Sequence, residues 1–155
     1  LDLGTGSGVL AVCAARYAAE VVAVDINPAA VRCARINALL NGVEDRLTVC
    51  EGDLFAPLGG RRFDLVLFNP PYFRGPPRSP LDRAFRATDV IERFAAGLAA
   101  ALAPGGKALL VLSTNGEQAA TLQALADHGY ASRPLAQRDA ISELLTVYQV
   151  VPQGD

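Results

Sequence analysis

The sequence of 155 residues contains no methionine and no tryptophan, and it has a single histidine. Charged residues make up only 19% of the chain and hydrophobic residues 51%, a balance that excludes the highly charged, disordered class of chain. The most apolar stretch, residues 95–112, is interrupted by Pro104-Gly105-Gly106-Lys107. It therefore falls short of the roughly 18 continuous apolar residues that span a bilayer. We expect a globular, cytoplasmic chain without a membrane segment.

Cysteine and positive charge are also scarce. Cys13, Cys33 and Cys50 are an odd number and lack the paired spacing of a metal site. Each falls among apolar neighbours, so we expect buried, reduced thiols and no metal. The net charge of -2 and the pI of about 5.4 give no overall positive field of the kind that draws a domain to nucleic acid. This weakens, without excluding, an RNA or DNA substrate.

The chain begins abruptly. Leu1-Asp2-Leu3 has the pattern of a strand already under way, and we expect residues to precede it, so that the chain is truncated at its N-terminus. A length of 155 residues is enough for one domain with a single core. No repeat, linker or second domain stands out in the sequence, so we expect residues 1–155 to form one domain.

Short β-branched runs alternate with amphipathic, alanine-rich segments, which is typical of an α/β protein with a mainly parallel sheet. The patterns predict strands at residues 21–26, 47–52, 63–68 and 107–113, and helices at residues 8–19, 28–40, 88–102 and 117–127. Residues 132–140, a weak strand or loop, and residues 143–151, a strong strand, have no helix between them. Two such strands must pair as a hairpin, so one edge of the sheet should contain an antiparallel strand.

Helix boundaries carry recognisable signals. Asn27 is a candidate N-cap with Pro28 at the first helical position, and Asn41-Gly42 closes the same helix. Pro104-Gly105-Gly106 is predicted to end the third helix, and His128-Gly129 the fourth. The single histidine is therefore interpreted as a helix-end residue rather than a catalytic one.

A glycine-rich turn, Gly4-Thr5-Gly6-Ser7-Gly8, joins the first strand to the first helix. Glycines without Cβ atoms let backbone N–H groups approach a ligand, and this place in the fold is typical of a ligand-binding turn. A dinucleotide site requires the spacing G-x-G-x-x-G, but the position that its third glycine would occupy is Val9, a β-branched residue. Asp2 precedes the turn, where its carboxylate is suited to the ammonium group of an amino acid and not to a pyrophosphate.

Two further carboxylates follow successive strands. Asp25, with Ile26 beside it, ends one strand, where the carboxylate can accept both hydroxyls of a ribose. Asp53 ends the next, where it can accept an adenine amino group while Leu54 packs on the ring. Since the carboxyl ends of parallel strands border the ligand crevice, Asp2, Gly4, Asp25 and Asp53 should converge. Each has a structural alternative: Asp25 as a cap of the helix that begins near residue 27, and Asp53 as the organiser of a turn.

The fourth strand ends in Asn69-Pro70-Pro71-Tyr72. Two prolines fix their φ angles and donate no backbone hydrogen bonds, so the Asn69 side-chain oxygen and the Pro70 carbonyl form a rigid pair of acceptors. Such a pair suits the two N–H donors of an amide or an aromatic amine, and would turn the nitrogen lone pair toward a methyl donor for in-line displacement. Tyr72 offers a flat surface for a planar group, or else is a core aromatic.

The segment Asp2 to Gly8 together with Asn69-Pro70-Pro71-Tyr72 resembles the N-directed class I methyltransferases. Within that group the chain is most similar to the glutamine N5-methyltransferases of peptide-chain release factors (HemK/PrmC-like), including the small type of archaea and eukaryotes. The resemblance covers essentially the whole chain, through residues 144–148. It implies a Rossmann-like, doubly wound, mainly parallel seven-stranded sheet with a reversed last strand, and S-adenosylmethionine as cofactor.

The resemblance also implies roles for individual residues. Cofactor contacts are implied for Asp2, Gly4, Asp25, Asp53, Leu54 and Asn69, and we predict that Thr5, Gly6, Gly8 and Ile26 belong to the same site. The segment Asn69-Pro70-Pro71-Tyr72 is predicted to grip the target nitrogen. Residues 73–86, rich in proline and with four arginines, are interpreted as a lid over the substrate or as a solvated loop.

Three functions are open at this point. The first is methylation of a glutamine side chain in a release factor, and some relatives of the small type work with an activating zinc-binding subunit. The second is methylation of an adenine or guanine amino group in RNA or DNA, with the arginines of residues 74–86 as a phosphate-binding rim. The third is a cofactor-binding subunit without catalysis, against which the intact Asn69-Pro70-Pro71-Tyr72 argues.

Overall fold

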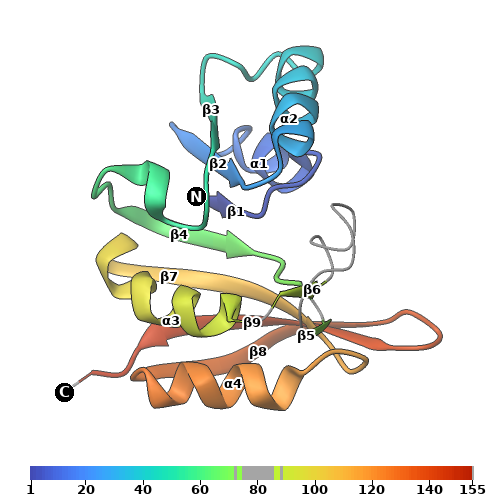
Figure 1. Cartoon of the computed structure of the whole chain (residues 1–155), viewed down its shortest axis with the longest axis vertical. Coiled ribbons are helices and arrows are strands. Elements are labelled where there is room, and N and C mark those ends of the chain that lie inside the picture. The colour runs from blue at the N-terminus through green and yellow to red at the C-terminus, as the bar shows by residue number, and fades with distance from the viewer. Residues whose placement is uncertain (72, 75–85, 88, 155) are drawn as a thin grey trace. The chain divides into compact units, whose positions relative to one another are not determined.

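A computed structural model of the chain describes residues 1–71, 73–74, 86–87 and 89–154 (Figure 1). The backbone groups into two compact units, one of residues 1–61 with 66–68 and the other of residues 62–65 with 69–155. We describe each unit by itself. The expectation of a single domain over residues 1–155 stays a prediction.

The strands form a seven-stranded sheet in the order β3-β2-β1-β4-β7-β9-β8. Strand β1 pairs in parallel with β2 and β4, β2 pairs in parallel with β3, and β9 is antiparallel to both β7 and β8. The predicted α/β class and the terminal hairpin are therefore confirmed. The strands are β1 (Asp2–Leu3), β2 (Val21–Asp25), β3 (Leu47–Glu51), β4 (Phe63–Phe68), β7 (Leu102–Ser113), β8 (Tyr130–Asp139) and β9 (Leu144–Pro152).

The helices agree with the predicted ones except at some ends. They are α1 (Val9–Ala14), α2 (Pro28–Leu40), α3 (Val90–Ala101) and α4 (Gln118–Asp127), with a 3-10 turn at Ala56–Leu58. Helix α2 has the predicted cap, because the Asn27 side chain accepts a hydrogen bond from the Ala29 N–H at 3.0 Å. Helix α1 stops at Ala14, five residues before the predicted end.

The end of α3 lies one residue before the predicted limit. Helix α3 ends at Ala101, and Pro104-Gly105-Gly106 follow it inside β7. Leu102 is already extended, with φ -84° and ψ 133°. The residue that precedes a proline is pushed out of the helical region, so the chain leaves the helix before it reaches Pro104. His128 does lie at the end of α4, where its Nδ1 is 2.8 Å from the Ala124 carbonyl oxygen.

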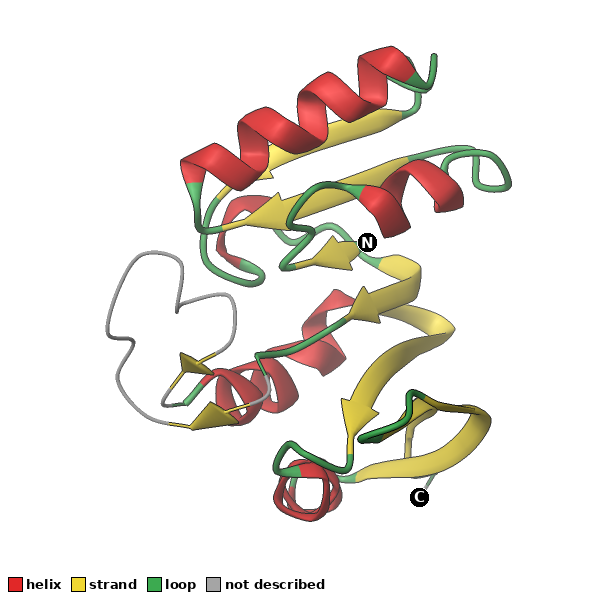
Figure 2. Ribbon diagram, turned by 90° about the vertical axis from the view of Figure 1, so that its right-hand side faces the viewer, coloured by secondary structure: helices red, strands yellow, loops and turns green. Residues whose placement is uncertain are grey.

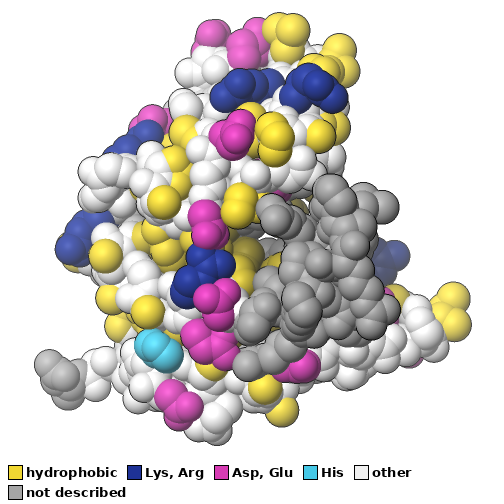
Figure 3. Space-filling view, viewed as in Figure 1, with side chains coloured by type: hydrophobic (Ala, Val, Ile, Leu, Met, Phe, Trp, Pro, Cys, Tyr) yellow, Lys and Arg dark blue, Asp and Glu magenta, His cyan; other side chains and the backbone are white. Residues whose placement is uncertain are grey.

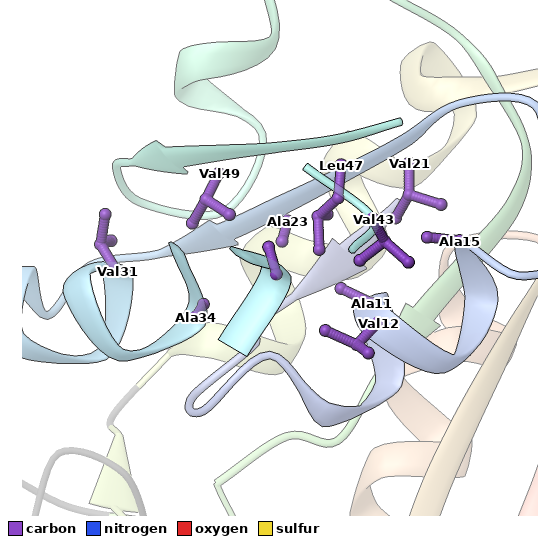
Figure 4. Close-up of a cluster of buried hydrophobic side chains, with 11 residues drawn as sticks. Ala11, Val12, Ala15, Val21, Ala23, Val31, Ala34, Val43, Leu47 and Val49 are labelled. Carbon is purple, nitrogen blue, oxygen red and sulfur yellow. The ribbon is translucent and has the colours of Figure 1, made fainter. Parts of the chain in front are cut away.

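In the first unit, α1 and α2 cover the same face of the strands. Figure 2 shows α2 running alongside the strands of this unit. The buried residues of Figure 4 come from both helices and from β2 and β3, with small alanines where the helices approach the sheet. The buried positions on α2, Val31, Ala34 and Ala38, are spaced three and four apart, which is one face of a helix. The members of this core are Ala11, Val12, Ala15, Val21, Ala23, Val31, Ala34, Ala38, Val43, Leu47 and Val49.

In the second unit, α3 and α4 contact each other, and α4 packs on β8. Helix α3 buries Ile91, Phe94, Ala95, Leu98 and Ala101, again with helical spacing. On the paired strands β7 and β9, Ala108 faces Val150 and Leu110 faces Tyr148, all of them buried. The paired strands β7 and β9 thus contribute a buried face to this unit.

Two further observations concern the surface. Cys13 and Cys33 are exposed and Cys50 is half-buried, so the prediction of buried thiols is wrong for the first two. The prediction relied on apolar residues next to each cysteine in the sequence. On a helix, however, the buried side is made of residues three and four positions apart and not of direct neighbours.

Among the helices in the described ranges, none is long and apolar enough to cross a membrane. Figure 3 shows acidic and basic side chains interspersed over the face in view.

Gly8 yields a stability prediction. It adopts φ +84°, and a Cβ placed there would lie 2.9 Å from Cβ and 3.0 Å from Cα of Ala34 on α2. A side chain at this position therefore adds a clash to the strain of a left-handed backbone. We expect Gly8→Ala to lower the free energy of unfolding by about 3 kcal/mol, measured by urea titration.

Gly6→Ala is the matched control. Gly6 also has a positive φ, +57°, but a Cβ there meets none of the described atoms within 4 Å. Only backbone strain remains, so this variant should lose about 1 kcal/mol. Equal losses in the two variants would show that the approach of α2 to Gly8 contributes nothing.

Candidate functional site

The glycine turn after β1 is held by its own backbone. Gly4, Gly6 and Gly8 have φ values of 61°, 57° and 84°, a region that residues with a Cβ rarely adopt. The Thr5 N–H donates to the Val24 carbonyl at 3.0 Å, and the Gly8 N–H donates to the Thr5 carbonyl at 2.9 Å. The turn is thereby fastened to the end of β2, with Gly4 exposed and Gly6 half-buried.

Asp2 is buried beneath this turn, with only 1% of its surface exposed. Its Oδ2 accepts a hydrogen bond from the Thr5 hydroxyl at 2.6 Å and one from the Ala11 N–H at 3.1 Å. Burial raises the pKa of the Asp2 carboxyl to about 6, although the bonds from Thr5 and Ala11 pull it down. In the structure Asp2 and Thr5 tie the turn to α1, and a direct contact of Asp2 with a ligand ammonium group stays a prediction.

Asp25 joins three segments at the carboxyl end of β2. Its Oδ2 accepts the Gly6 N–H at 2.8 Å and its Oδ1 accepts the Asn27 N–H at 2.9 Å. The N-cap of α2 is Asn27 and not Asp25, so Asp25 does not cap the helix but supports the residue that does. Each oxygen of an ionised carboxylate has further acceptor capacity, so these bonds leave room for a pair of ligand hydroxyls. Ile26 next to it is 50% exposed and offers an apolar surface at the same strand end.

The end of β3 is drawn to the same place. The Gly52 N–H donates to the Asp25 carbonyl at 3.0 Å, so Asp53 and Leu54 follow directly on a residue bonded to the end of β2. The Ala56 N–H donates to the Asp53 carbonyl at 3.0 Å, so Asp53 also begins a turn, as the structural alternative for this residue predicts. Leu54 has φ 47°, and a strained backbone held by its surroundings is often found at functional sites.

One contact was missed from the sequence. Nδ2 of Asn37, on α2, donates to the Ser7 carbonyl in the glycine turn at 2.8 Å. The available signal was weak: Asn37 is a polar residue next to the buried Ala38 and three positions after the buried Ala34. Asparagine there is equally compatible with a solvated helix flank.

The Asn69-Pro70-Pro71-Tyr72 segment follows β4. Strand β4 ends at Phe68, which is paired with Leu3 of β1. Asn69 is exposed and Pro70 is buried, whereas Tyr72 and residues 75–85 of the predicted lid lie outside the described residues. The backbone of β5 (Phe73–Arg74) pairs in parallel with that of β6 (Arg86–Ala87), so the two ends of residues 73–86 lie side by side.

The predicted cofactor residues of the first unit therefore do gather at one edge of the sheet. Asp2, Thr5, Gly6 and Asp25 are linked by hydrogen bonds, and Gly52 brings β3 to the same point. Gly6 with open space beside it, acceptor capacity on Asp25 and the exposed Ile26 fit a ligand that has a polar chain, a diol and an apolar ring. The individual roles stay predictions.

The chain is similar in sequence to a known protein family. Residues 1–131 match the family model described as methyltransferase small domain. The chain is 37% identical over 139 residues to the release factor glutamine methyltransferase of Moorella thermoacetica (81% of this chain, 48% of that protein). It is 35% identical over 153 residues to the ribosomal protein uL3 glutamine methyltransferase of Bradyrhizobium diazoefficiens (90% and 46%). It is 32% identical over 122 residues to the tRNA1(Val) (adenine(37)-N6)-methyltransferase of Porphyromonas gingivalis (72% and 48%).

The chain spans about half the length of these relatives. Solved structures share its fold. One is the ribosomal protein L11 methylase of Lactobacillus delbrueckii subsp. bulgaricus, with a TM-score of 0.74 and 22% identity over 99% of this chain and 69% of that one. Another belongs to the Mtq2–Trm112 complex of E. cuniculi, with a TM-score of 0.69 and 24% identity over 99% of this chain and 83% of that one.

Asp2 makes the stability of the chain depend on pH. Its folded-state pKa of about 6 lies above the ordinary value of 3.8, so between these values the folded chain holds a proton that the unfolded chain has lost. Stability from this group is present below pH 4 and is lost as pH rises through 6. The free energy of unfolding, taken relative to Asp2→Asn, should fall by about 2.5 kcal/mol between pH 4 and pH 7, measured by urea titration.

Substitutions of Thr5 test whether Asp2 causes this pH dependence of stability. Thr5→Val removes a hydrogen bond that lowers the pKa of Asp2, so the decline should extend to higher pH. Thr5→Ser retains a hydroxyl donor and should keep the parent's pH dependence. A constant difference between the parent and Asp2→Asn at every pH would refute the assignment to Asp2.

Proposed function

Because this chain belongs to the methyltransferase small domain family, we propose that it transfers a methyl group to a planar nitrogen, most specifically the side-chain amide of a glutamine. Its cofactor is S-adenosylmethionine, whose sulfonium centre supplies an electrophilic methyl group. The cofactor part of the proposal is supported by the glycine turn and the ends of β2 and β3, which are joined by hydrogen bonds. The part on the methyl acceptor rests on Asn69-Pro70-Pro71-Tyr72.

The proposed cofactor contacts follow the chemistry of each residue. The Asp25 carboxylate accepts the ribose hydroxyls, as an ionised carboxylate with spare lone pairs can. The backbone of Gly4 and Gly6 lies beside the polar chain, because no Cβ stands in the way. The pKa of Asp2 is about 6, so a cation nearby favours its ionised form. In that form the carboxylate stabilises the cationic amino end of the cofactor. Ile26 and Leu54 flank the adenine, and Asp53 accepts its amino group.

The acceptor residues act without a metal or a strong base in this proposal. The side-chain oxygen of Asn69 and the carbonyl of Pro70 accept the two N–H groups of the target, which draws its lone pair out of conjugation. The nitrogen would then attack the methyl carbon, so that an N–C bond forms while the C–S bond breaks and its electron pair stays on sulfur as a neutral thioether. The methylated nitrogen would afterwards release one proton to solvent. Prolines at positions 70 and 71 stiffen the backbone, so the acceptors are oriented before the substrate arrives.

Glutamine is favoured over a nucleobase by two observations. Two relatives whose names specify glutamine methylation align with 81% and 90% of the chain. The net charge of -2 gives the chain no general attraction to a polyanion. We therefore propose a protein substrate, with the glutamine of a peptide-chain release factor as the first candidate.

A nucleobase amino group is the second candidate. It is supported by the relative named as a tRNA adenine-N6 methyltransferase, which aligns with 72% of the chain. The same pair of acceptors would serve an exocyclic amine, which also offers two N–H donors on a planar group. A local cluster of arginines in residues 74–86 would then be needed to bind phosphate.

Asn69→Ala tests the catalytic role. Removal of an acceptor that acts on the reacting nitrogen should lower the rate of methyl transfer at least about a hundredfold, with the fold retained by circular dichroism. The matched control is Asn41→Ala at the end of α2, which should keep the rate within about twofold. Full transfer by Asn69→Ala would refute the mechanism, and a parent that binds the cofactor without any transfer would favour the non-catalytic subunit.

The substrate is tested with methyl-labelled S-adenosylmethionine. The chain is incubated with a release factor, and with the same factor carrying Gln→Asn at its target, and we expect label only in the former. Total cellular RNA serves as the competing substrate. Label in nuclease-sensitive material would show that the methyl acceptor is a nucleobase and not a glutamine. Each reaction is repeated with a Trm112-type subunit, because one structural neighbour is a complex with Trm112; transfer that requires it would assign an activating partner.

A further inference from the structure

We propose that Asn37 is a positioning residue for the cofactor, acting through the carbonyl of Ser7. The inference rests on the proposed function, since it assumes that the glycine turn is where S-adenosylmethionine binds. The bond from Asn37 Nδ2 to the Ser7 oxygen is 2.8 Å long and joins residues that are 30 positions apart. Asn37 thereby connects the second helix to the turn that follows the first strand.

The Ser7 carbonyl lies outside the hydrogen-bond ladder of α1. Gly8 is the N-cap of this helix, so the ladder begins with the bond from the Val12 N–H to the Gly8 carbonyl at 2.8 Å, and Ser7 precedes it. The Ala11 N–H, which has no acceptor within the helix, donates to Oδ2 of Asp2 at 3.1 Å. Asp2 thus satisfies a donor at the start of α1, and Asn37 donates to a carbonyl that the ladder does not use.

Helix α2 contacts the turn at two successive levels. Ala34 packs against Gly8 so closely that no Cβ fits on the glycine. Asn37, three positions further along, bonds to Ser7 on the same side of the helix. These two contacts fix the outer half of the turn, while Asp25 holds the inner half by accepting the Gly6 N–H at 2.8 Å.

The Asn37 side chain is itself oriented within α2. Its Nδ2 lies 3.8 Å from the sulfur of Cys33, one helical turn earlier, which suits its second N–H. Its main-chain carbonyl accepts from Nδ2 of Asn41 at 2.8 Å. Two asparagines four positions apart on one helix therefore play different parts: Asn37 reaches the turn, and Asn41 closes the end of the helix.

This difference provides a matched pair of variants. Asn37→Asp keeps the shape of the side chain but removes both N–H donors and places a carboxylate oxygen toward the Ser7 carbonyl. Asn41→Asp removes the corresponding donors from the helix end and adds the same charge near the C-terminus of α2, where it is equally unfavourable for the helix dipole. Any effect of charge or helix stability is thus common to both variants.

The first measurement requires no cofactor. Amide hydrogen exchange of Gly6 and Gly8, followed by NMR, reports on the turn itself. We expect exchange at both glycines to be at least about fivefold faster in Asn37→Asp, the size expected for loss of one neutral hydrogen bond, and within about twofold of the parent in Asn41→Asp. Unchanged exchange in Asn37→Asp, or equal acceleration in both variants, would overturn the proposal.

The second measurement links the turn to binding. The Kd for S-adenosylmethionine, by isothermal titration calorimetry, should rise at least about fivefold in Asn37→Asp and stay within about twofold in Asn41→Asp. In the transfer assay the KM for the cofactor should rise with it, while kcat at saturating cofactor is unchanged. A parent chain that does not bind the cofactor would refute the proposed function, while the exchange experiment would still decide the role of Asn37.

Discussion

The candidate site depends above all on the carboxylate of Asp25. One of its oxygens accepts the Gly6 N–H of the turn after β1, and the other accepts the Asn27 N–H at the start of α2. The Asp25 carbonyl also accepts the Gly52 N–H at the end of β3. A single residue therefore sets the relation between three strand ends, and because charged acceptors make the stronger hydrogen bonds, this junction is ordered before any ligand binds.

The same junction explains why helix α2 matters to the turn. Asp25 is followed by Asn27, whose side chain caps α2 through the Ala29 N–H, so the position of the helix is fixed from the strand end. The helix then returns to the turn, with Ala34 against Gly8 and Asn37 on Ser7. Residues 25–37 thus hold the turn from both sides. A site built in this way relies on backbone groups and on short side chains, and short side chains lose little rotamer entropy on ordering.

Much of this could be predicted from the sequence because the signals are local. The strand and helix periodicities, the Asn27-Pro28 cap and the glycine spacing each depend on neighbours along the chain, and β4 and α2 have the predicted limits. The burial of Asp2, the exposure of Cys13 and Cys33 and the bond from Asn37 to Ser7 could not be predicted in this way. They depend on which side of a helix faces the sheet and on contacts between segments distant in sequence, where the same residue types have several compatible environments. The end of α3 at Ala101, shortly before Pro104, is another signal that is local in the sequence.

Asp2 shows how the needs of a site can oppose those of a fold. Burial disfavours the charged form of this carboxyl, and its pKa of about 6 means that ionising it costs more free energy in the folded chain than in the unfolded chain. An asparagine would fill the same space without that cost. What the carboxylate adds is a negative charge that a nearby cation would stabilise, on a group that also accepts the Ala11 N–H at the start of α1. Binding of a ligand with an ammonium group would therefore restore stability that the unliganded chain lacks, so ligand affinity and the ionisation of Asp2 should be linked.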